Sequence, residues 1–435
     1  MNYGKKRIIM KNVLYYVGSM LMILLISACS SEGNSSEYED DNNPLDSTIV
    51  YALPNTRSVE LTEEQKLFVK KNNDFAFNFY RAVNNVYGGQ STITSPLSAT
   101  YLMGMINDGA EGITEQEITA MLGFGSGEKK AVNEFCKALI EQAPQTDPSV
   151  ILQITNLIAT DKKVEIMEPF RKDMADYYQA EVTALDFTQP SATDYLNKWC
   201  KDKTQGMVSA IVDEVDPTTL FALMNAICFK ALWTNKFNKD NTRDEEFITQ
   251  DGGKLTLPMM YQRVNALYGE NDIYSMLCLP YGSWGWNMYI LLPHKNNGID
   301  GLINSLSEKT WLQSLNSDNA VVDVKIPKFK TANNLPLMDI VSRLGAPSMF
   351  EPEKANLSGI SKNTNPLYIT RIQQAAAIEV SEEGTEASAV SIAAGTISSP
   401  MDPYKKVDFH CNRPFVYIIQ EASSGAIFFI GTFRG

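Results

Sequence analysis

The sequence predicts one α+β domain that follows an export leader and a polar tether. Three observations support this prediction. Helix signals gather early in residues 62–435, long apolar strand-like runs dominate later, and neither an internal repeat nor a long linker divides the region. With 44% hydrophobic and 20% charged residues, the chain of 435 residues has enough apolar side chains for a large core.

Residues 1–28 are typical of an export signal. A basic head with four cationic side chains precedes an apolar run that is shorter than the roughly 20 residues of a membrane-spanning helix. The run ends in Ile26-Ser27-Ala28-Cys29, which resembles a bacterial lipobox, so we expect cleavage before Cys29 and lipidation of that cysteine. The alternative is an ordinary signal peptide with an incidental cysteine. Cleavage removes four basic and no acidic residues, which changes the net charge from −13 to −17.

Residues 29–61 are rich in Ser, Asn, Asp and Glu and contain few large apolar side chains. Such a segment buries too little surface to offset its ordering entropy, so we interpret it as a disordered acidic tether. Its acidic run Glu37–Asp41 is interpreted as part of the tether and not as a metal or partner site. Ser30 and Ser31 resemble the start of lipoproteins sent to an outer membrane. We therefore expect an exported protein, lipid-anchored in the bacterial envelope, that faces the periplasm or the cell surface.

Composition also excludes several classes of function. The 51 acidic against 38 basic residues argue against nucleic-acid binding, which needs clustered positive charge. Only two histidines occur in the sequence, His294 and His410, and this scarcity weighs against His-based metal centres and most Ser-His or Cys-His catalytic sites. Five cysteines remain once Cys29 is lipidated, at irregular spacing and with no C-x-x-C pair, so we expect buried hydrophobes and neither disulfides nor zinc. No metal or cofactor is expected.

Three helix starts are predicted in the first third of the domain. Thr62-Glu63-Glu64-Gln65 and Thr114-Glu115-Gln116-Glu117 both have the form of a capping box, the second with Ile113 and Ile118 as its hydrophobic staple. Ser95-Pro96 places an N-cap before a proline suited to the first turn. After the first box, one helical face is apolar, at Phe75, Phe79, Ala82, Val83 and Val86.

Strand signals follow. The nearly continuous apolar run Phe221–Phe229 predicts a strand buried on both faces. Val322, Val324 and Ile326 alternate with charged residues until Pro327. Near the end of the chain, Phe415–Ile419 and Ala426–Ile430 predict a hairpin joined by residues 420–425.

A segment of unusual periodicity begins at Thr385. Every second residue is small and uncharged: Thr385, Ala387, Ala389, Ser391, Ala393 and Gly395. The alternate set carries the only charge and the larger side chains: Glu386, Ser388, Val390, Ile392, Ala394 and Thr396. Because strand residues alternate between two faces, the pattern suits a segment that slides into a sheet with its small face on the core. The alternative is a flexible small-residue linker.

Motifs in this order resemble the serpin family over essentially everything after the tether. They are Ser95-Pro96-Leu97-Ser98, Asn225 to Trp233, Pro327-Lys328-Phe329, the hinge Glu382 to Ala389, Arg413-Pro414-Phe415 and Phe428-Phe429-Ile430-Gly431. The resemblance implies a serpin fold: three β-sheets, about eight or nine helices, and an exposed reactive-centre loop at about 381–407. It also implies that the domain is not an enzyme.

The resemblance assigns roles to individual residues. It implies a hinge that enters the sheet, formed by Glu383, Gly384, Thr385, Glu386, Ala387, Ser388 and Ala389. It implies a region where the sheet opens, formed by Ser95, Ser98, Asn225, Trp233 and Gln374. Serpins often carry a histidine at the position of Gln374, which hydrogen-bonds an asparagine like Asn225. A glutamine amide can still donate and accept there, but the departure changes the expected ease and pH sensitivity of opening.

The resemblance further implies a suicide inhibitor of endopeptidases. In such inhibitors the cleaved loop is added to a sheet as a new strand, and the strain stored in the intact protein is released. Counting fifteen residues from the hinge glycine places the bait bond at Ser398–Ser399, with Thr396, Ile397 and Met401 as alternatives. No Arg or Lys lies near that bond, which disfavours trypsin-like targets and favours elastase-like or subtilisin-like enzymes, with papain-like cysteine proteases as a further option. The expected partner is a protease held covalently by a monomer.

Two rivals remain beside this interpretation. A non-inhibitory serpin would act as a binding or chaperone module at the cell envelope, although such members usually lose the small-residue hinge that this chain keeps. A surface peptidase is the second rival, but neither Ser398 nor Ser399 has a base visible in the sequence.

Overall fold

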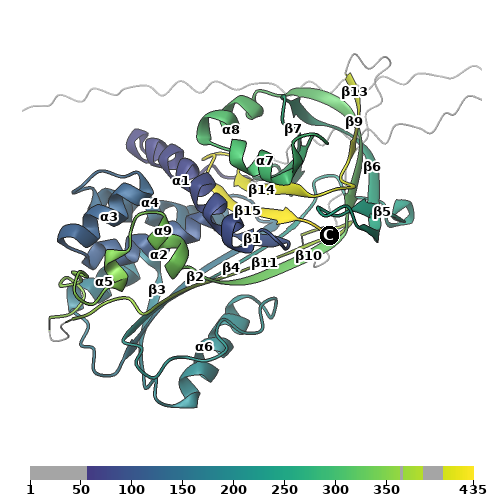
Figure 1. Cartoon of the computed structure of the whole chain (residues 1–435). Coiled ribbons are helices and arrows are strands. Elements are labelled where there is room, and N and C mark those ends of the chain that lie inside the picture. The colour runs from purple at the N-terminus through teal and green to yellow at the C-terminus, as the bar shows by residue number, and fades with distance from the viewer. Residues whose placement is uncertain (1–55, 363–365, 386–404) are drawn as a thin grey trace, which may run out of the picture. The chain divides into compact units, whose positions relative to one another are not determined.

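Two β-sheets and nine α-helices make up the residues that the computed structural model describes, 56–362, 366–385 and 405–435 (Figure 1). The leader and residues 29–55 of the expected tether lie outside these residues, as do residues 386–404 with the expected bait bond. The last residues of the expected tether instead pack on the domain: Val59 is buried and its amide donates to the Ser423 hydroxyl, and the Arg57 amide donates to the Thr146 carbonyl. The helices are α1 Glu63–Tyr87, α2 Pro96–Gly109, α3 Gly112–Leu122, α4 Lys129–Gln142, α5 Glu168–Tyr178, α6 Pro190–Lys203, α7 Gly298–Ser305, α8 Glu308–Leu315 and α9 Met338–Arg343.

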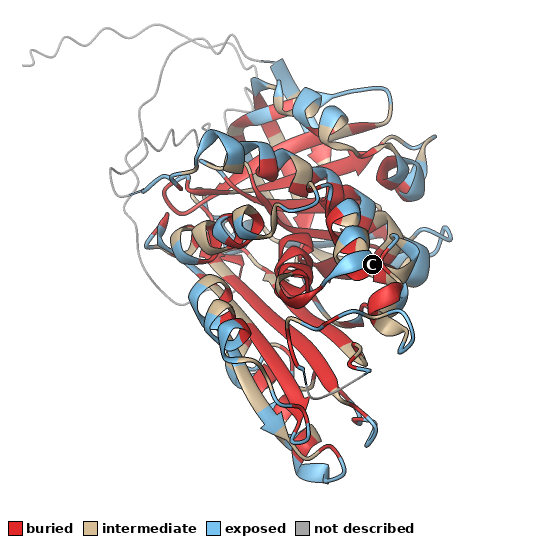
Figure 2. Cartoon of the chain, turned by 90° about the vertical axis from the view of Figure 1, so that its left-hand side faces the viewer, coloured by how far each residue is buried: buried red, intermediate tan, exposed pale blue. Residues whose placement is uncertain are grey.

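One sheet has six strands in the order β10-β11-β12-β4-β2-β3. The bounds are β2 Val150–Asp161, β3 Ala180–Leu185, β4 Phe221–Leu232, β10 Phe329–Pro336, β11 Arg371–Val380 and β12 Gly384–Thr385. The apolar run at 221–229 is the core of β4, where every residue except Lys230 is buried, so the predicted strand with two covered faces is confirmed (Figure 2).

The two faces of this sheet have different covers. On the outer face, α6 packs Leu196 and Trp199 against small residues of β4 and β11, such as Ala226 and Ala375. The inner face contributes to the main core together with α2 and the second sheet, and α1, α2 and α9 lie on that side (Figure 1).

The second sheet has nine strands, in the order β1-β15-β14-β8-β7-β6-β9-β13 with β5 paired to β6. Its bounds are β1 Thr92–Thr94, β5 Arg243–Ile248, β6 Lys254–Glu270, β7 Tyr274–Tyr281, β8 Trp286–Pro293, β9 Asp318–Pro327, β13 Lys405–His410, β14 Phe415–Glu421 and β15 Ile427–Phe433. The 17-residue β6 pairs with both β7 and β9, and so it joins two of the three expected sheets into one hydrogen-bonded sheet. The predicted hairpin near the end of the chain is the antiparallel pair β14–β15.

Two of the three predicted helix starts are confirmed. Thr62 caps α1 through a complete capping box with Gln65, and Ser95 caps α2. The box predicted at Thr114 is wrong, because α3 already begins at Gly112 and Thr114 lies inside the helix. The buried Thr114 hydroxyl instead accepts a hydrogen bond from the amide of Asn356, a distant chain segment whose pairing moves the start of the helix.

Side-chain burial agrees with the periodicities except at two positions. Phe75, Phe79 and Val83 are buried, whereas Val86 at the end of α1 and Ile113 at the start of α3 are exposed. The five cysteines of the described residues are buried, as expected: Cys136, Cys200, Cys228, Cys278 and Cys411. No helix among the described residues has the length and apolar character needed to cross a membrane.

Candidate functional site at the seam of the six-stranded sheet

The line between β4 and β11 is called the seam here. The two strands run parallel and pair directly from Arg371 opposite Ala222 up to Ala377 opposite Cys228. Beyond that level β12 lies between them and runs antiparallel to both. The seam is therefore closed along most of its length. At the end where β4 and β11 terminate, it holds the first two residues of an additional strand.

Gly384 is required at the start of β12. Its φ is +146°, a region that residues with a side chain rarely adopt. A Cβ at this position would lie 2.1 Å from the carbonyl oxygen of Ala231 and 2.6 Å from the Cα of Leu232. Because both obstacles are backbone atoms of β4, only glycine lets the hinge come this close to the neighbouring strand.

Thr385 points into the core. It is fully buried, and its hydroxyl lies 2.7 Å from the hydroxyl of Tyr281. The Tyr281 ring stacks on Trp233, with ring centroids 4.3 Å apart and an interplanar angle of 10°. Trp233 donates its backbone amide to the carbonyl of Glu383 and its indole Nε1 to the carbonyl of Ser381, both at 2.9 Å. These contacts fix which face of the hinge meets the core.

Glu382 anchors the turn between β11 and β12. Its side chain is 5% exposed, lies 2.9 Å from the Lys328 ammonium and accepts a hydrogen bond from the Thr242 hydroxyl at 2.9 Å. Burial raises the pKa of Glu382, but hydrogen bonds from Lys328, its own backbone and Thr242 outweigh it, so the pKa lies below its usual value of 4.5. The next residue, Glu383, forms ion pairs with Lys236 at 2.8 Å and Lys239 at 3.0 Å.

We expect Lys328→Ala to lower the unfolding midpoint of the intact protein by about 2–6 °C, because it leaves a buried carboxylate without its cation. A group whose folded pKa is depressed stabilises the fold above its ordinary pKa, and the effect is lost as pH falls through the folded value. The variant should thus differ most from the wild type above pH 4.5 and converge with it at lower pH. Calorimetry from pH 3 to pH 8 measures this.

Lys330→Ala serves as the matched control. Lys330 on β10 pairs with Glu379 on β11 close by, but both side chains of that pair are about half exposed, so the loss should be small. Equal effects of the two substitutions would contradict the assigned role of the buried pair.

A second group of residues meets lower on the seam. Gln374 on β11 and Asn225 on β4 lie opposite each other in the parallel register, and both side chains are fully buried. The Gln374 amide hydrogen-bonds Thr94 and Ser95, while Asn225 donates to Asn156 on β2 at 2.9 Å. The buried Ser98 lies in the first turn of α2, where its amide donates to the Ser95 hydroxyl.

The structure thus separates the predicted opening residues into two places. Ser95, Ser98, Asn225 and Gln374 surround the middle of the seam, whereas Trp233 lies beyond the end of β4 beside the hinge. Of the predicted hinge, Glu383, Gly384 and Thr385 are described. Glu386, Ala387, Ser388, Ala389 and the candidate bait residues Thr396, Ile397, Ser398, Ser399 and Met401 lie outside the described residues, and their roles stay predictions.

Sequence reasoning missed several residues that hold the hinge. Tyr281 contacts Thr385, yet it closes an apolar strand with no motif around it. Asn156 accepts the hydrogen bond from Asn225. It was missed because it lies on β2, a strand whose buried and exposed residues follow no simple alternation. Lys328 lay inside the quoted Pro327-Lys328-Phe329 motif. A lone lysine between two residues that begin and end strands was the signal that could have pointed to an ion pair.

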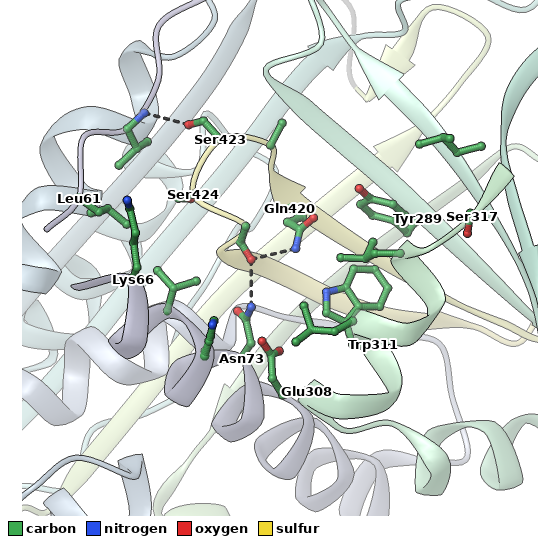
Figure 3. A pocket seen from close by; sticks show the side chains of 18 of the residues that line it. Leu61, Lys66, Asn73, Tyr289, Glu308, Trp311, Ser317, Gln420, Ser423 and Ser424 are labelled. Carbon is green, nitrogen blue, oxygen red and sulfur yellow. Dashed lines mark hydrogen bonds between the residues drawn. The ribbon is translucent and has the colours of Figure 1, made fainter. Parts of the chain in front are cut away.

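A cavity of about 430 Å³ lies away from the seam, between α1, α8 and the turn that joins β14 to β15 (Figure 3). None of the residues that line it belongs to β4, β11 or β12. Its wall includes Trp311, whose buried Nε1 finds no partner in the described part of the chain, and Glu308, whose buried Oε2 finds none either. Burial raises the pKa of Glu308 to about 7.

We expect Glu308→Gln to raise the unfolding midpoint at pH 8 and to leave it unchanged near pH 4.5. A raised folded pKa means that the stabilising contribution is fully present below the ordinary value of 4.5 and is lost as pH rises through about 7. The corresponding gain in the free energy of unfolding at pH 8 should be about 1–2 kcal/mol, because the Glu308 carboxyl keeps part of its solvent contact. Thermal unfolding at both pH values measures it, and an equal gain at both would contradict the titration of Glu308.

The described residues contain no group of three or more His, Cys, Asp or Glu side chains placed to hold a metal ion. The chemistry of the seam is instead that of backbone pairing: two diverging strands, a third strand begun between them, and buried polar side chains along the line of contact.

Comparison with known proteins adds a family match. The family model described as serpin (serine protease inhibitor) matches residues 70–434. Human leukocyte elastase inhibitor is 30% identical over 375 residues, which cover 83% of this chain and 97% of the relative. Human neuroserpin is 29% identical over 373 residues, covering 82% and 89% of the two chains. An uncharacterized serpin-like protein of Methanosarcina acetivorans is 30% identical over 366 residues, covering 83% and 84%.

Solved structures agree with these matches. Tengpin, a thermophilic serpin in its native state, superposes with a TM-score of 0.78 at 25% identity, over 89% of this chain and 97% of tengpin. Native protease nexin-1 with heparin superposes with a TM-score of 0.74 at 27% identity, over 85% of this chain and all of the other. The fold around the seam is shared with both.

Proposed function

Because the chain belongs to the serpin family, most of whose members inhibit proteases, we propose that it is an irreversible suicide-substrate inhibitor of endopeptidases. A target protease cleaves the exposed loop, and the freed segment enters the seam as a full strand before the covalent intermediate is hydrolysed. The protein is consumed in the reaction and has no turnover of its own.

One observation carries this proposal: β12 is the beginning of a strand between β4 and β11, and its register can be continued. Thr385 lies opposite Ala231 and Val380. If a continued strand kept this register, Glu386 would come opposite Lys230 on the outer face, and Ser391 would come opposite both Asn225 and Gln374 on the inner face. Since Thr385 faces the core, the small set that begins with it would face the core as well.

The fit between segment and seam supports insertion. The small inner set would meet the inner face of β4 and β11, where Phe229, Ile227 and Ile378 already belong to the densely packed main core. The larger alternate residues, Val390 and Ile392, would join the apolar cluster beneath α6. Each inserted residue would hydrogen-bond to a strand on both sides, which stabilises the product relative to the intact molecule.

Trapping follows from the order of events. Attack by the nucleophile of the protease on the bait carbonyl breaks the peptide bond, releases the new amino terminus and leaves an acyl-enzyme. Insertion then carries the acylated end along the sheet. Distortion of the oxyanion hole of the protease removes the hydrogen bonds that its deacylation step needs, so the ester persists.

The loop sequence indicates the class of target. We place the bait bond at Ser398–Ser399, where small and β-branched neighbours suit elastase-like or subtilisin-like pockets. The match to a leukocyte elastase inhibitor supports the same class. Ile397 also keeps papain-like cysteine proteases as possible targets. These enzymes recognise the second residue before the cleaved bond, which is Ile397 when the bond is Ser398–Ser399.

The test is incubation of the whole exported protein with an elastase-like, a subtilisin-like and a papain-like protease. At least one serine protease should give a complex that survives SDS and has about the summed mass of inhibitor and protease. Mass spectrometry should show that the small released peptide begins at Ser399. Cleavage without any such complex would reject inhibition and favour the alternative, a non-inhibitory serpin that acts as a binding or chaperone module.

We also propose that the inhibitor is a monomer held at the bacterial cell envelope through lipid on Cys29, with the residues between Cys29 and the start of the domain near Arg57 as its tether. Membrane fractionation of cells that express the wild type and Cys29→Ser tests this. The wild type should sediment with membranes, at the outer membrane, and the variant should be released. Equal membrane retention of both proteins would contradict anchoring at Cys29.

A further inference from the structure

The Gln374 side chain ties β11 to the helix layer and not to β4. Its Oε1 accepts hydrogen bonds from the Thr94 hydroxyl at 2.6 Å and from the Ser95 amide at 2.9 Å. Its Nε2 donates to the Ser95 carbonyl at 2.8 Å. Thr94 ends β1 and Ser95 caps α2, so all three bonds lead away from the seam.

The neighbouring strand β10 is held to the same body. The Asn333 Oδ1 accepts a hydrogen bond from the amide of Ile93 on β1 at 2.5 Å, one residue before Thr94. Asn333 pairs with Ala376 of β11 in the antiparallel register. Two adjacent strands on one side of the seam are therefore tied to β1 and to the start of α2.

Asn225 belongs to a separate network on the other side of the seam. Its Nδ2 donates to the Asn156 Oδ1 on β2 at 2.9 Å, and the Asn156 Nδ2 donates to the carbonyl of Tyr178 at the end of α5, also at 2.9 Å. The Asn225 Oδ1 is buried and finds no hydrogen-bond partner in the described part of the chain. A buried acceptor in this state is costly, since it has lost water and gained nothing in exchange.

We propose that Gln374 is a positioning residue that keeps the middle of the seam free of side-chain hydrogen bonds, so that β4 and β11 part there by breaking backbone bonds alone. The Oδ1 of Asn225 is then an acceptor that no side chain across the seam engages in the described part of the chain. This inference rests on the proposed insertion mechanism and adds to it which bonds break where the sheet divides.

The inference explains the departure from the residue often found here. A histidine that hydrogen-bonds Asn225 would cross the seam and would have to let go during opening. Gln374 reaches back to Ser95 instead, and the bonds it makes there need not break when the strands separate. The two halves of the sheet can thus move apart with their own side-chain networks intact.

A double-mutant cycle on the whole protein tests this, with the rate of loop insertion after protease cleavage as the readout. Gln374→Met combined with Asn225→Ala should be additive to within about twofold, because the two side chains do not bond. Gln374→His should slow insertion by about threefold to tenfold when Asn225 is present, the effect of one added hydrogen bond, and by less than twofold in the Asn225→Ala background. Gln373→Met is the control, since the Gln373 amide donates to Asn334 instead.

Strong coupling between Gln374→Met and Asn225→Ala would overturn the inference, because it would reveal a bond across the seam in the wild type. So would an equal effect of Gln374→His with and without Asn225. If no protease is trapped at all, the proposed function fails, and the same cycle is read in the unfolding midpoint of the intact protein. There, additivity for methionine and coupling for histidine support the division of the sheet, and coupling for methionine overturns it.

Discussion

Thr385→Arg is expected to convert the inhibitor into a substrate. Thr385 is already fully buried in β12 and hydrogen-bonded to Tyr281 in the intact protein. A guanidinium at this position would leave the core, and strand insertion would have to drive it back in without a partner. Burial of an unpaired charge costs several kcal/mol, enough to slow insertion below the rate of deacylation. The fraction of protease trapped should fall by about tenfold or more, while cleavage of the loop continues.

The matched control is Thr385→Ser, which keeps the hydroxyl and the small volume and should trap protease nearly as well as the wild type. Gel analysis of complex against cleaved inhibitor, at several ratios of inhibitor to protease, measures both variants. Full complex formation by Thr385→Arg would mean that trapping does not need residue 385 in the sheet, and the insertion mechanism would be wrong.

Cleavage inside residues 386–404 is expected to raise the unfolding midpoint by about 10 °C or more, without any change in composition. The intact sheet pairs β4 and β11 directly, and insertion would replace that single ladder by two ladders and add buried apolar surface beneath α6. Several new backbone pairs with their packing are worth on the order of 10 kcal/mol, which at this chain length shifts the midpoint by that amount.

The experiment uses a protease that cleaves the loop without being trapped, followed by its removal and calorimetry. Thr385→Arg, treated in the same way, is the control, because its segment cannot enter the seam and its midpoint should stay close to that of the intact protein. An unchanged midpoint in the cleaved wild type would show that no strand is added.

The sequence predicted well those features that depend on local pattern. The buried strand at 221–229, the capped starts of α1 and α2, and the hairpin near the end of the chain all follow from apolar periodicity or from a cap, and all are present. The start of α3 was misplaced, because a contact with Asn356, more than 200 residues away, competes with the local capping box. Pattern reads neighbours in sequence and not partners in space.

The candidate site shows the same division. The alternation from Thr385 onward gave the correct face for the one of these residues that the structure describes, because the side-chain period of a strand is fixed by geometry. The partners of the hinge, Tyr281 and Lys328, come from strands remote in sequence, and nothing local marks them. The direction of the Gln374 amide likewise depends on which of two neighbouring layers offers the better partners, a choice that is made only when the sheet packs on α2.

The two residues of β12 have a kinetic consequence. Starting a new ladder between two strands is the slow part of strand growth, because the first residues lose freedom before many hydrogen bonds form. Here that nucleus exists before any protease arrives, with Gly384 and Thr385 already in register. After cleavage, strand insertion therefore starts from two residues that are already paired. Only the faster growth of the strand competes with deacylation of the protease.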